Sequence, residues 1–187
     1  FVEGDALEPN SPYSASKAAA DLLARAYRVT HGYPITVTRT ANNFGPYHYP
    51  EKVIPLFVTN LIDGEKVPLY GDGGNVRDWL HVADHCLGIE VVLQRGEPGR
   101  SYNIGGGTEL TNLELTQRLL DAMGHDWDMV EHVEDRKGHD RRYSVDDSLL
   151  RGLGYAPQRP FDEGLEETIA WYRANEPWWR PLKGKLT

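Results

Sequence analysis

Apolar side chains recur at helical spacing in six stretches of the chain, separated by short β-branched or apolar runs. The longest stretch is 12–31, where alanines, leucines and a tyrosine repeat every three or four residues and Gly32 is a suitable C-cap. Helices are predicted over 12–31, 53–62, 84–94, 112–123, 147–153 and 162–175, and strands over 35–39, 67–70, 76–82 and 101–104, with 141–145 extended. Strands that alternate with helices predict an α/β protein.

Loops and caps follow from residue type. The stretch 42–50 is rich in Gly, Pro, Asn and Tyr and is predicted to be an irregular loop. Asp84 and Asn112 are the expected caps of the helices that they begin. The triplet 105–107 is all glycine, but it lacks the spacing of either phosphate-binding fingerprint and is interpreted as a turn between a strand and a helix.

Composition narrows the class of protein. Of the 187 residues, 40% are hydrophobic and 26% are charged, which is typical of a globular chain. The net charge of −8 argues against general affinity for nucleic acid or anionic membranes, and no apolar run reaches the roughly 18 residues of a membrane span. Cys86 is the single cysteine, so no disulfide is expected, which suits the reducing cytoplasm that we expect for this protein. The seven histidines show no metal-ligand spacing, so no metal site is expected.

Tyr13 and Lys17 are the first candidates for chemistry. They are four residues apart at the start of a predicted helix and therefore share one face. A free tyrosine is a poor base at neutral pH, whereas a nearby ammonium and a helix N-terminus favour the phenolate. The pair could therefore take a proton from a sugar hydroxyl. An ordinary solvent-facing Tyr and Lys is the other interpretation of the pattern.

Longer motifs favour the first interpretation. The segment 9–18, PNSPYSASKA, resembles the region around the active tyrosine of extended short-chain dehydrogenases that act on nucleotide sugars. The segments 42–55, 68–73, 76–79 and 135–143 (NNFGPYHYPEKVIP, PLYGDG, VRDW and DRKGHDRRY) are similar to those of dTDP-glucose 4,6-dehydratases, in the same order. The resemblance covers nearly the whole chain.

The resemblance implies a fold and a division of the chain into domains. It predicts the C-terminal portion of a Rossmann-type doubly wound parallel sheet plus a small mixed α/β substrate-binding lobe. Residues 1–41 would be the remainder of the dinucleotide-binding domain, and 42–187 mainly the lobe, with about 76–95 returning to the Rossmann domain. The activity implied is that of a carbon–oxygen lyase, which dehydrates dTDP-glucose to dTDP-4-keto-6-deoxy-glucose with tightly held NAD in deoxysugar biosynthesis.

The resemblance also implies residue roles. Tyr13 would be the base, and Lys17 and Asn43 would join it in binding NAD. The diphosphate would meet Arg77, whose planar fork suits phosphate oxygens. Expected substrate contacts are Asn42, Lys52, Val53, Pro68, Leu69, Tyr70, Arg77, Asn112, Asp135, Arg136, Lys137, Gly138 and His139. From the residues alone, the asparagine pair could equally be turn residues, 68–70 a core strand, Arg77 a surface charge, Asn112 a cap and 135–139 a solvated loop.

Two family features are missing from the 187 residues: the Gly-rich dinucleotide fingerprint and the Thr-Asp-Glu trio used for elimination. We therefore expect a C-terminal half that is inactive alone. The competing hypotheses are a UDP-sugar epimerase or decarboxylase, a non-catalytic nucleotide-sugar-binding fragment, and a structural interaction domain. The wide apolar face of the 12–31 helix also predicts a homodimer through that helix.

Overall fold

The computed structural model describes residues 1–183. In chain order the elements are α1 (Pro12–His31), β1 (Val37–Thr40), β2 (Asn42–Phe44), α2 (Val53–Ile62), β3 (Val67–Tyr70), β4 (Val76–His81), α3 (Val82–Arg95), β5 (Ser101–Ile104), β6 (Thr108–Thr111), α4 (Asn112–Met123), the 3-10 turn η1 (Trp127–Met129), β7 (Val130–Val133), β8 (Arg142–Tyr143), α5 (Ser148–Gly152), α6 (Phe161–Ala174) and α7 (Glu176–Lys183). None of the described helices is long and apolar enough to cross a membrane.

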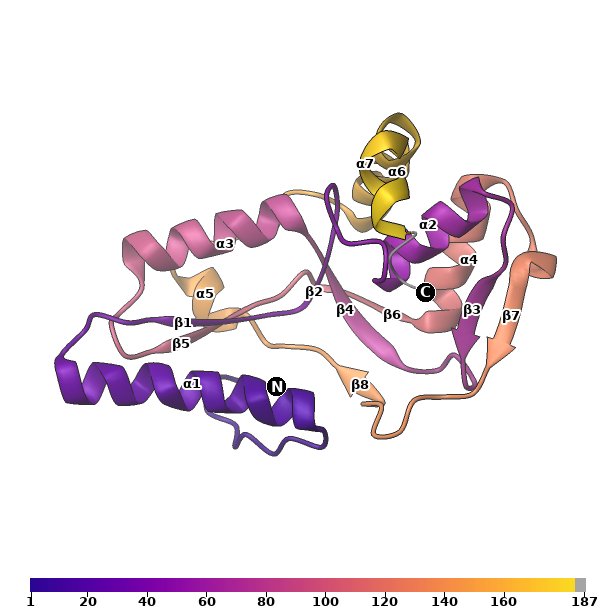
Figure 1. The fold of residues 1–187 in the computed structure, drawn as a ribbon. Helices are drawn as coiled ribbons and strands as arrows, with labels where there is room; N and C mark the ends of the chain where they lie inside the picture. The colour runs from indigo at the N-terminus through magenta and orange to yellow at the C-terminus, as the bar shows by residue number, and fades with distance from the viewer. Residues whose placement is uncertain (184–187) are drawn as a thin grey trace.

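Strand pairing is mostly parallel, and the protein is α/β. Strand β1 pairs with β5, and β3 with β7, both in parallel. Strand β4 is the centre of the largest sheet: it pairs in parallel with β2 and β8, and antiparallel with β6. Helices α1 and α3 lie on opposite sides of the β1–β5 pair, whereas α2, α4, α6 and α7 gather at the other end of the molecule (Figure 1). The predicted fold class is confirmed.

Two hydrophobic cores meet at β4. The larger core packs α2, α4 and α6 against the sheet and includes Trp79, Phe44 and Trp179. The smaller core lies between β1, β5, α3 and α5 and includes Leu80 and Ile104. Successive side chains of a strand point to opposite faces, so the neighbours Trp79 and Leu80 enter different cores. Strand β4 therefore holds the two parts of the fold together.

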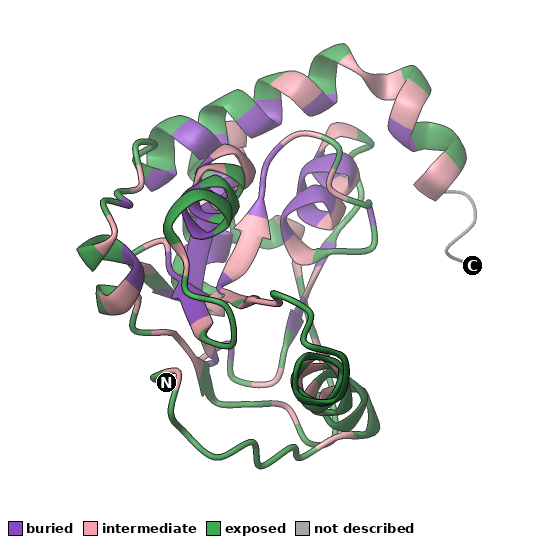
Figure 2. Ribbon diagram, turned by 90° about the vertical axis from the view of Figure 1, so that its left-hand side faces the viewer, coloured by how far each residue is buried: buried purple, intermediate pink, exposed green. Residues whose placement is uncertain are grey.

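Helix α1 is the least covered element. It has no buried residue, and Leu22 and Leu23 are 60% and 58% exposed. Figure 2 views the helix nearly end-on and shows it apart from the buried interior. An open groove of about 140 Å³ runs between α1 and β1, bounded partly by Asp21 and Arg39, whose ion pair (2.7 Å) bridges it. Leu22 and Leu23 therefore leave apolar surface of α1 exposed.

Several predicted elements need correction. Strand β2 lies inside the predicted loop, because Asn42–Phe44 pairs with β4. Strand β6 follows the glycine triplet, which therefore connects two strands rather than a strand and a helix. The caps also differ. His81 caps α3 through Nδ1, which accepts the N–H of Ala83, and Thr111 caps α4 in a reciprocal box with Glu114. The sequence analysis also did not predict β7, α7 or η1.

Candidate functional site

The first turn of α1 presents Tyr13 and Lys17 together. Ser11 caps the helix by accepting the N–H of Ser14 at Oγ (3.1 Å), and Pro12 occupies the first turn, where no donor is needed. The Lys17 ammonium lies 5.9 Å from the centre of the Tyr13 ring. Tyr13 is 71% exposed, so its hydroxyl is open to a ligand.

The segment 135–139 is an organised charged loop. Asp135 Oδ1 and His139 Nδ1 are 2.7 Å apart, and His139 Nε2 is 2.9 Å from an Arg136 nitrogen. The hydrogen bond from His139 holds the pKa of Asp135 below its usual value. Arg136 also lies 5.5 Å from the centre of the Tyr70 ring, a cation–π distance. The loop therefore brings a guanidinium onto an aromatic face, with Lys137 exposed beside it.

Arg77 on β4 points toward the same loop. Its guanidinium donates to the carbonyls of Val76 (2.7 Å) and Asp140 (2.9 Å). Burial lowers its pKa, and the nearby Arg136 lowers it further, against the opposing effect of Asp140. Arg77 thus lies near a second cation, Arg136, and near the carboxylates of Asp135 and Asp140. Guanidinium groups pair well with phosphate oxygens, so both arginines are candidates for binding an anion.

The arginine cluster and the Tyr13 helix adjoin each other. A Cβ added to Gly138 would lie 3.4 Å from the carbonyl oxygen of Asn10, just before α1. Burial raises the pKa of Tyr143, whose charged and phenolic neighbours include Asp140 and Tyr13. The Tyr143 hydroxyl donates to the Thr40 carbonyl (3.2 Å), which ties this region to the end of β1.

The asparagine pair lies on β2. Asn42 is opposite Trp79 on β4, two positions along from Arg77. Asn43 donates to Thr40 Oγ1 (3.3 Å), whereas its buried Oδ1 has no hydrogen-bond partner among the described residues. A buried carbonyl oxygen without a donor is an acceptor left for a ligand or for water.

The remaining predicted residues surround this region less closely. Lys52 is the N-cap residue of α2, with Glu51 3.6 Å from its ammonium, and Val53 follows it half-buried. On β3, Tyr70 is 36% exposed and Pro68 is half-buried. Leu69 is 1% exposed, so a ligand could reach only its main chain. Asn112 begins α4, and its N–H donates to the Asn75 carbonyl (3.0 Å).

Three residues of this region were not selected from the sequence: Asn75, Asp140 and Tyr143. Asn75 is 2% exposed and donates to the Asp140 carbonyl (3.2 Å), while its Oδ1 lacks a partner within residues 1–183. Its only signal in the sequence was a polar residue directly before a strand. Tyr143 was part of a quoted motif, but nothing in the pattern gave it a role.

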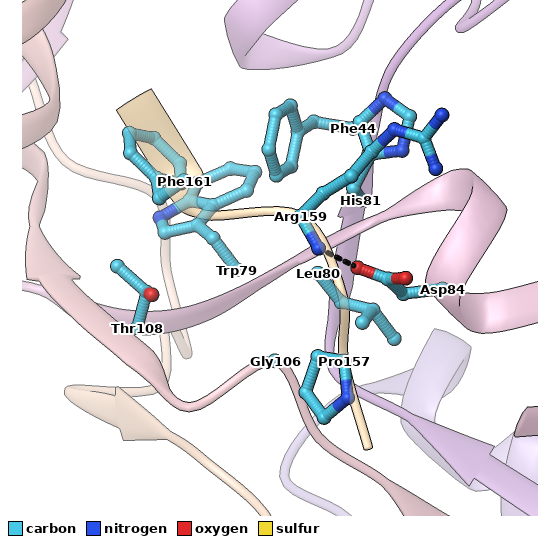
Figure 3. A pocket seen from close by; sticks show the side chains of 10 residues that line it. All are labelled: Phe44, Trp79, Leu80, His81, Asp84, Gly106, Thr108, Pro157, Arg159 and Phe161. Atoms are coloured by element: carbon cyan, nitrogen blue, oxygen red, sulfur yellow. Dashed lines mark hydrogen bonds between the residues drawn. The ribbon is translucent and has the colours of Figure 1, made fainter. Parts of the chain in front are cut away.

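A cavity in the interior of residues 1–183 is too small for a ligand. The cavity in Figure 3 lies between Phe44, Trp79 and Phe161 and measures about 10 Å³, which is room for one water molecule. In the described part of the chain, no three His, Cys, Asp or Glu side chains are placed to hold a metal ion. The candidate site is therefore the open surface at Tyr70, Arg77, Arg136 and Tyr13.

Comparison with protein families gives this geometry its context. The family model described as GDP-mannose 4,6 dehydratase matches residues 1–168. The chain belongs to this family. Among family members, the dTDP-glucose 4,6-dehydratase of Streptomyces antibioticus is 62% identical over 184 residues, which is 98% of this chain and 55% of that protein. The resemblance to dTDP-glucose 4,6-dehydratases predicted from the motifs is confirmed, and the chain spans about half the length of the curated relatives it matches.

Solved structures agree with this placement in the GDP-mannose 4,6-dehydratase family. The crystal structure of dTDP-glucose 4,6-dehydratase from Streptomyces venezuelae with NAD and TYD bound is 59% identical, with a TM-score of 0.95, and the match covers 97% of this chain and 57% of that one. A UDP-glucose 4-epimerase from Thermotoga maritima, with UDP-glucose, has a TM-score of 0.88 at 29% identity, covering 94% and 58%. The fold is thus shared more widely than the sequence.

Proposed function

We propose that the protein is a dTDP-glucose 4,6-dehydratase that uses NAD, and that this chain supplies the nucleotide-sugar surface and the catalytic tyrosine. The observation that carries the proposal is the convergence of the Tyr13–Lys17 pair with the Arg77–Arg136 cluster. The contact of Gly138 with Asn10 supports placing the proposed base and the two arginines on one surface. The relatives of 57–62% identity that carry this name support the choice of reaction.

The substrate would bind along this surface by its diphosphate and base. Arg77 and Arg136 are the groups for the diphosphate, because guanidinium forks pair with phosphate oxygens. Tyr70 is the aromatic face for the thymine ring. Asn42, Lys52, Val53 and Asn112 would contact the sugar nucleotide, with Pro68, the main chain of Leu69 and the rest of the 135–139 loop completing the surface.

The residues near Tyr13 are suited to the nicotinamide end of NAD. The unpartnered Oδ1 of Asn43 can accept a hydrogen bond, and the exposed Lys17 ammonium can donate to ribose hydroxyls. When bound, NAD would take hydride from the sugar C4 and return it to C6. The Gly-rich dinucleotide fingerprint is not among the 187 residues, so these contacts concern one end of the cofactor only.

Tyr13 would act as the base. Its phenolic oxygen would accept the proton of the C4 hydroxyl, and the Lys17 ammonium lies 5.9 Å from the centre of the same ring. The C4 ketone then acidifies the C5 proton, which permits loss of water across C5 and C6. We assign the elimination to no residue of this chain.

The test is turnover in the protein as its gene encodes it. With NAD, dTDP-glucose should give dTDP-4-keto-6-deoxy-glucose, whereas UDP-glucose should give no epimer. The 29% identity to the UDP-glucose 4-epimerase, against 59% to a dehydratase, supports this order of preference. Epimerisation of UDP-glucose without dehydration of dTDP-glucose would overturn the proposal, and binding of dTDP without turnover would favour a binding module.

We also propose that two copies pair through α1. Leu23 and Tyr27 remain 58% and 47% exposed on a helix without a buried residue, as an interface helix would be in a separated chain. Sedimentation of the protein as encoded should give a dimer at micromolar concentration, and Leu23→Glu should weaken it. A monomeric wild type would contradict the interface.

A further inference from the structure

Tyr47, in the loop between β2 and α2, adopts a left-handed backbone. Its φ is 62°, and within residues 1–183 it is the one non-glycine residue with positive φ. A bulky residue in this region is held there by its surroundings, and such residues cluster at functional sites. The loop joins Asn42 and Asn43 to Lys52 and Val53, which the proposed function places along the substrate.

Helices α6 and α7 hold Tyr47 by its ring. The ring centre lies 4.6 Å from that of Trp171 on α6 and 5.4 Å from that of Trp178 on α7. The two indoles are 5.2 Å apart in edge-to-face geometry. Three aromatic rings at these separations attract one another beyond their burial alone. We call Tyr47, Trp171 and Trp178 the aromatic clamp.

The helices do not depend on Tyr47 for their own position. Tyr172 and Trp179 are fully buried, and the indole N–H of Trp179 donates to the Tyr172 carbonyl (2.8 Å). Lys183 and Arg180 form ion pairs with Asp63 at the end of α2 (2.7 and 2.9 Å). Tyr47 itself is 67% exposed. The rigid partner is therefore the helix pair, and the element that it orders is the loop.

The loop is fixed at its other points too. The Tyr172 hydroxyl donates to the carbonyl of His48, next to the clamped residue. A Cβ on Gly45 would meet Val82 at 2.7 Å, so the start of the loop lies directly against α3. The Lys52 N–H donates to the Tyr49 carbonyl (3.0 Å) and closes the turn before α2. The clamp supplies the middle contact of a loop that follows β2, the strand of Asn42, and ends at Lys52.

We infer that Tyr47 is a positioning residue: the aromatic clamp fixes its left-handed backbone so that Asn42 and Lys52 stand at the spacing that the nucleotide sugar requires. This inference rests on the proposed function for the ligand, but the clamp itself is independent of it. Because Tyr13 lies on another element, the clamp acts on substrate binding and not on proton transfer.

The experiment compares Tyr47→Ala and Tyr47→Phe in the protein as its gene encodes it. Tyr47→Ala should raise KM for dTDP-glucose roughly tenfold with kcat within about twofold, the pattern of binding lost equally in the ground state and the transition state. Tyr47→Phe keeps the ring and should restore the wild-type KM. Trp178→Ala should act like Tyr47→Ala without adding to it, whereas Trp127→Ala, an exposed tryptophan outside the clamp, should leave KM unchanged.

Hydrogen exchange of the 45–52 amides separates this inference from the proposed function. Tyr47→Ala should speed exchange in that segment, with or without substrate, and Tyr47→Phe should not. Unchanged exchange in both Tyr47→Ala and Trp178→Ala would overturn the clamp. Faster exchange with an unchanged KM would overturn its positioning role. A wild type that does not turn over dTDP-glucose would instead remove the proposed function and leave the clamp to the exchange result.

Discussion

At the scale of single residues, Tyr13 is exposed, and the role proposed for it is chemical rather than structural. Among residues 1–183 its hydroxyl makes no hydrogen bond, and α1 has no buried residue. Tyr13→Phe removes the proton acceptor and keeps the ring, so turnover of dTDP-glucose should fall about 10²–10⁴-fold, the usual worth of general acid–base catalysis. Steady-state kinetics would measure this, and dTDP affinity serves as the control. Turnover near wild type in the Phe variant would remove Tyr13 as the base.

Arg77 is the residue to which the proposed function assigns the diphosphate. Arg77→Ala removes a half-buried cation, and dTDP binding should weaken by roughly 1.5–3 kcal/mol, the range for a charged hydrogen bond. Calorimetric titration with dTDP measures the change. Arg151 on α5 pairs with Asp147, the N-cap of that helix, and Arg151→Ala is the matched control, which should bind dTDP as the wild type does. An unchanged dissociation constant for Arg77→Ala would place the diphosphate elsewhere.

At the scale of elements, Asp84 shows how one helix orders a distant segment. It lies in the first turn of α3, is 2% exposed, and accepts the N–H groups of Gln158 and Arg159 at 3.0 Å each; Figure 3 shows the second of these bonds. These bonds hold the segment before α6 against α3. The predicted capping role for Asp84 was wrong because the carboxylate turns outward from its own helix.

Asp84→Asn should therefore destabilise the fold. The amide keeps one acceptor but sets an NH₂ against a buried N–H, so the free energy of unfolding should fall by about 1.5–3 kcal/mol. Urea denaturation measures it. Asp121→Asn on the exposed face of α4 keeps the acceptor for Gln117 and should cost less than about 0.5 kcal/mol. Equal stability of both variants would contradict a structural role for Asp84.

Most elements were predictable because their signals are local. The α1, α2 and β3 boundaries follow from periodicity, proline and glycine, and the structure matches them closely. Strand β7 is different: its residues Val130–Val133 are partly exposed, and its pairing with β3 joins positions some 60 residues apart. Helix α7 contains Pro181, which argues against a helix from sequence alone, yet burial of Trp179 stabilises it.

Residues of the candidate site could be predicted only where they belong to a recognisable sequence motif. The Tyr13–Lys17 spacing gives a shared helix face by geometry, and the structure brings the two side chains together. The adjacency of Gly138 to Asn10 could not be predicted, because no local rule places residues 128 positions apart in contact. Asn75 and Tyr143 were missed for the same reason: their importance lies in partners far away in sequence.

At the scale of the whole molecule, buried histidines make stability depend on pH. Burial lowers the pKa of His48 to about 4, and burial likewise lowers the pKa of His81 and His85. Since these pKa values lie below the unfolded value of 6.5, the unfolded chain takes up protons first as the pH falls. Stability is full above about pH 6.5 and is lost toward pH 4.

His48 alone should account for about 2 kcal/mol of lost stability between pH 7.5 and pH 5. The free energy of unfolding, from urea titrations at each pH, should decrease over this range, and His48→Gln should flatten the decrease. His132→Gln, at an exposed position on β7, is the matched control. A stability that stays level from pH 7.5 to pH 5 would contradict the burial of these imidazoles. Below pH 4 the carboxylates with lowered pKa, such as Asp63, add to the loss.

The position of Trp79 and Leu80 on β4 also guards against mispairing while the chain folds. If β4 slipped by one residue, the Trp79 indole would enter the small core, and the Leu80 side chain would be left in the space that fits the indole. Asp78 would also turn away from the N–H groups of Gly106 and Thr108. The same slip would carry Arg77 to the opposite face of the sheet. An off-register intermediate is thus penalised in both cores at once, so a molecule that completes its packing has also placed its arginine correctly.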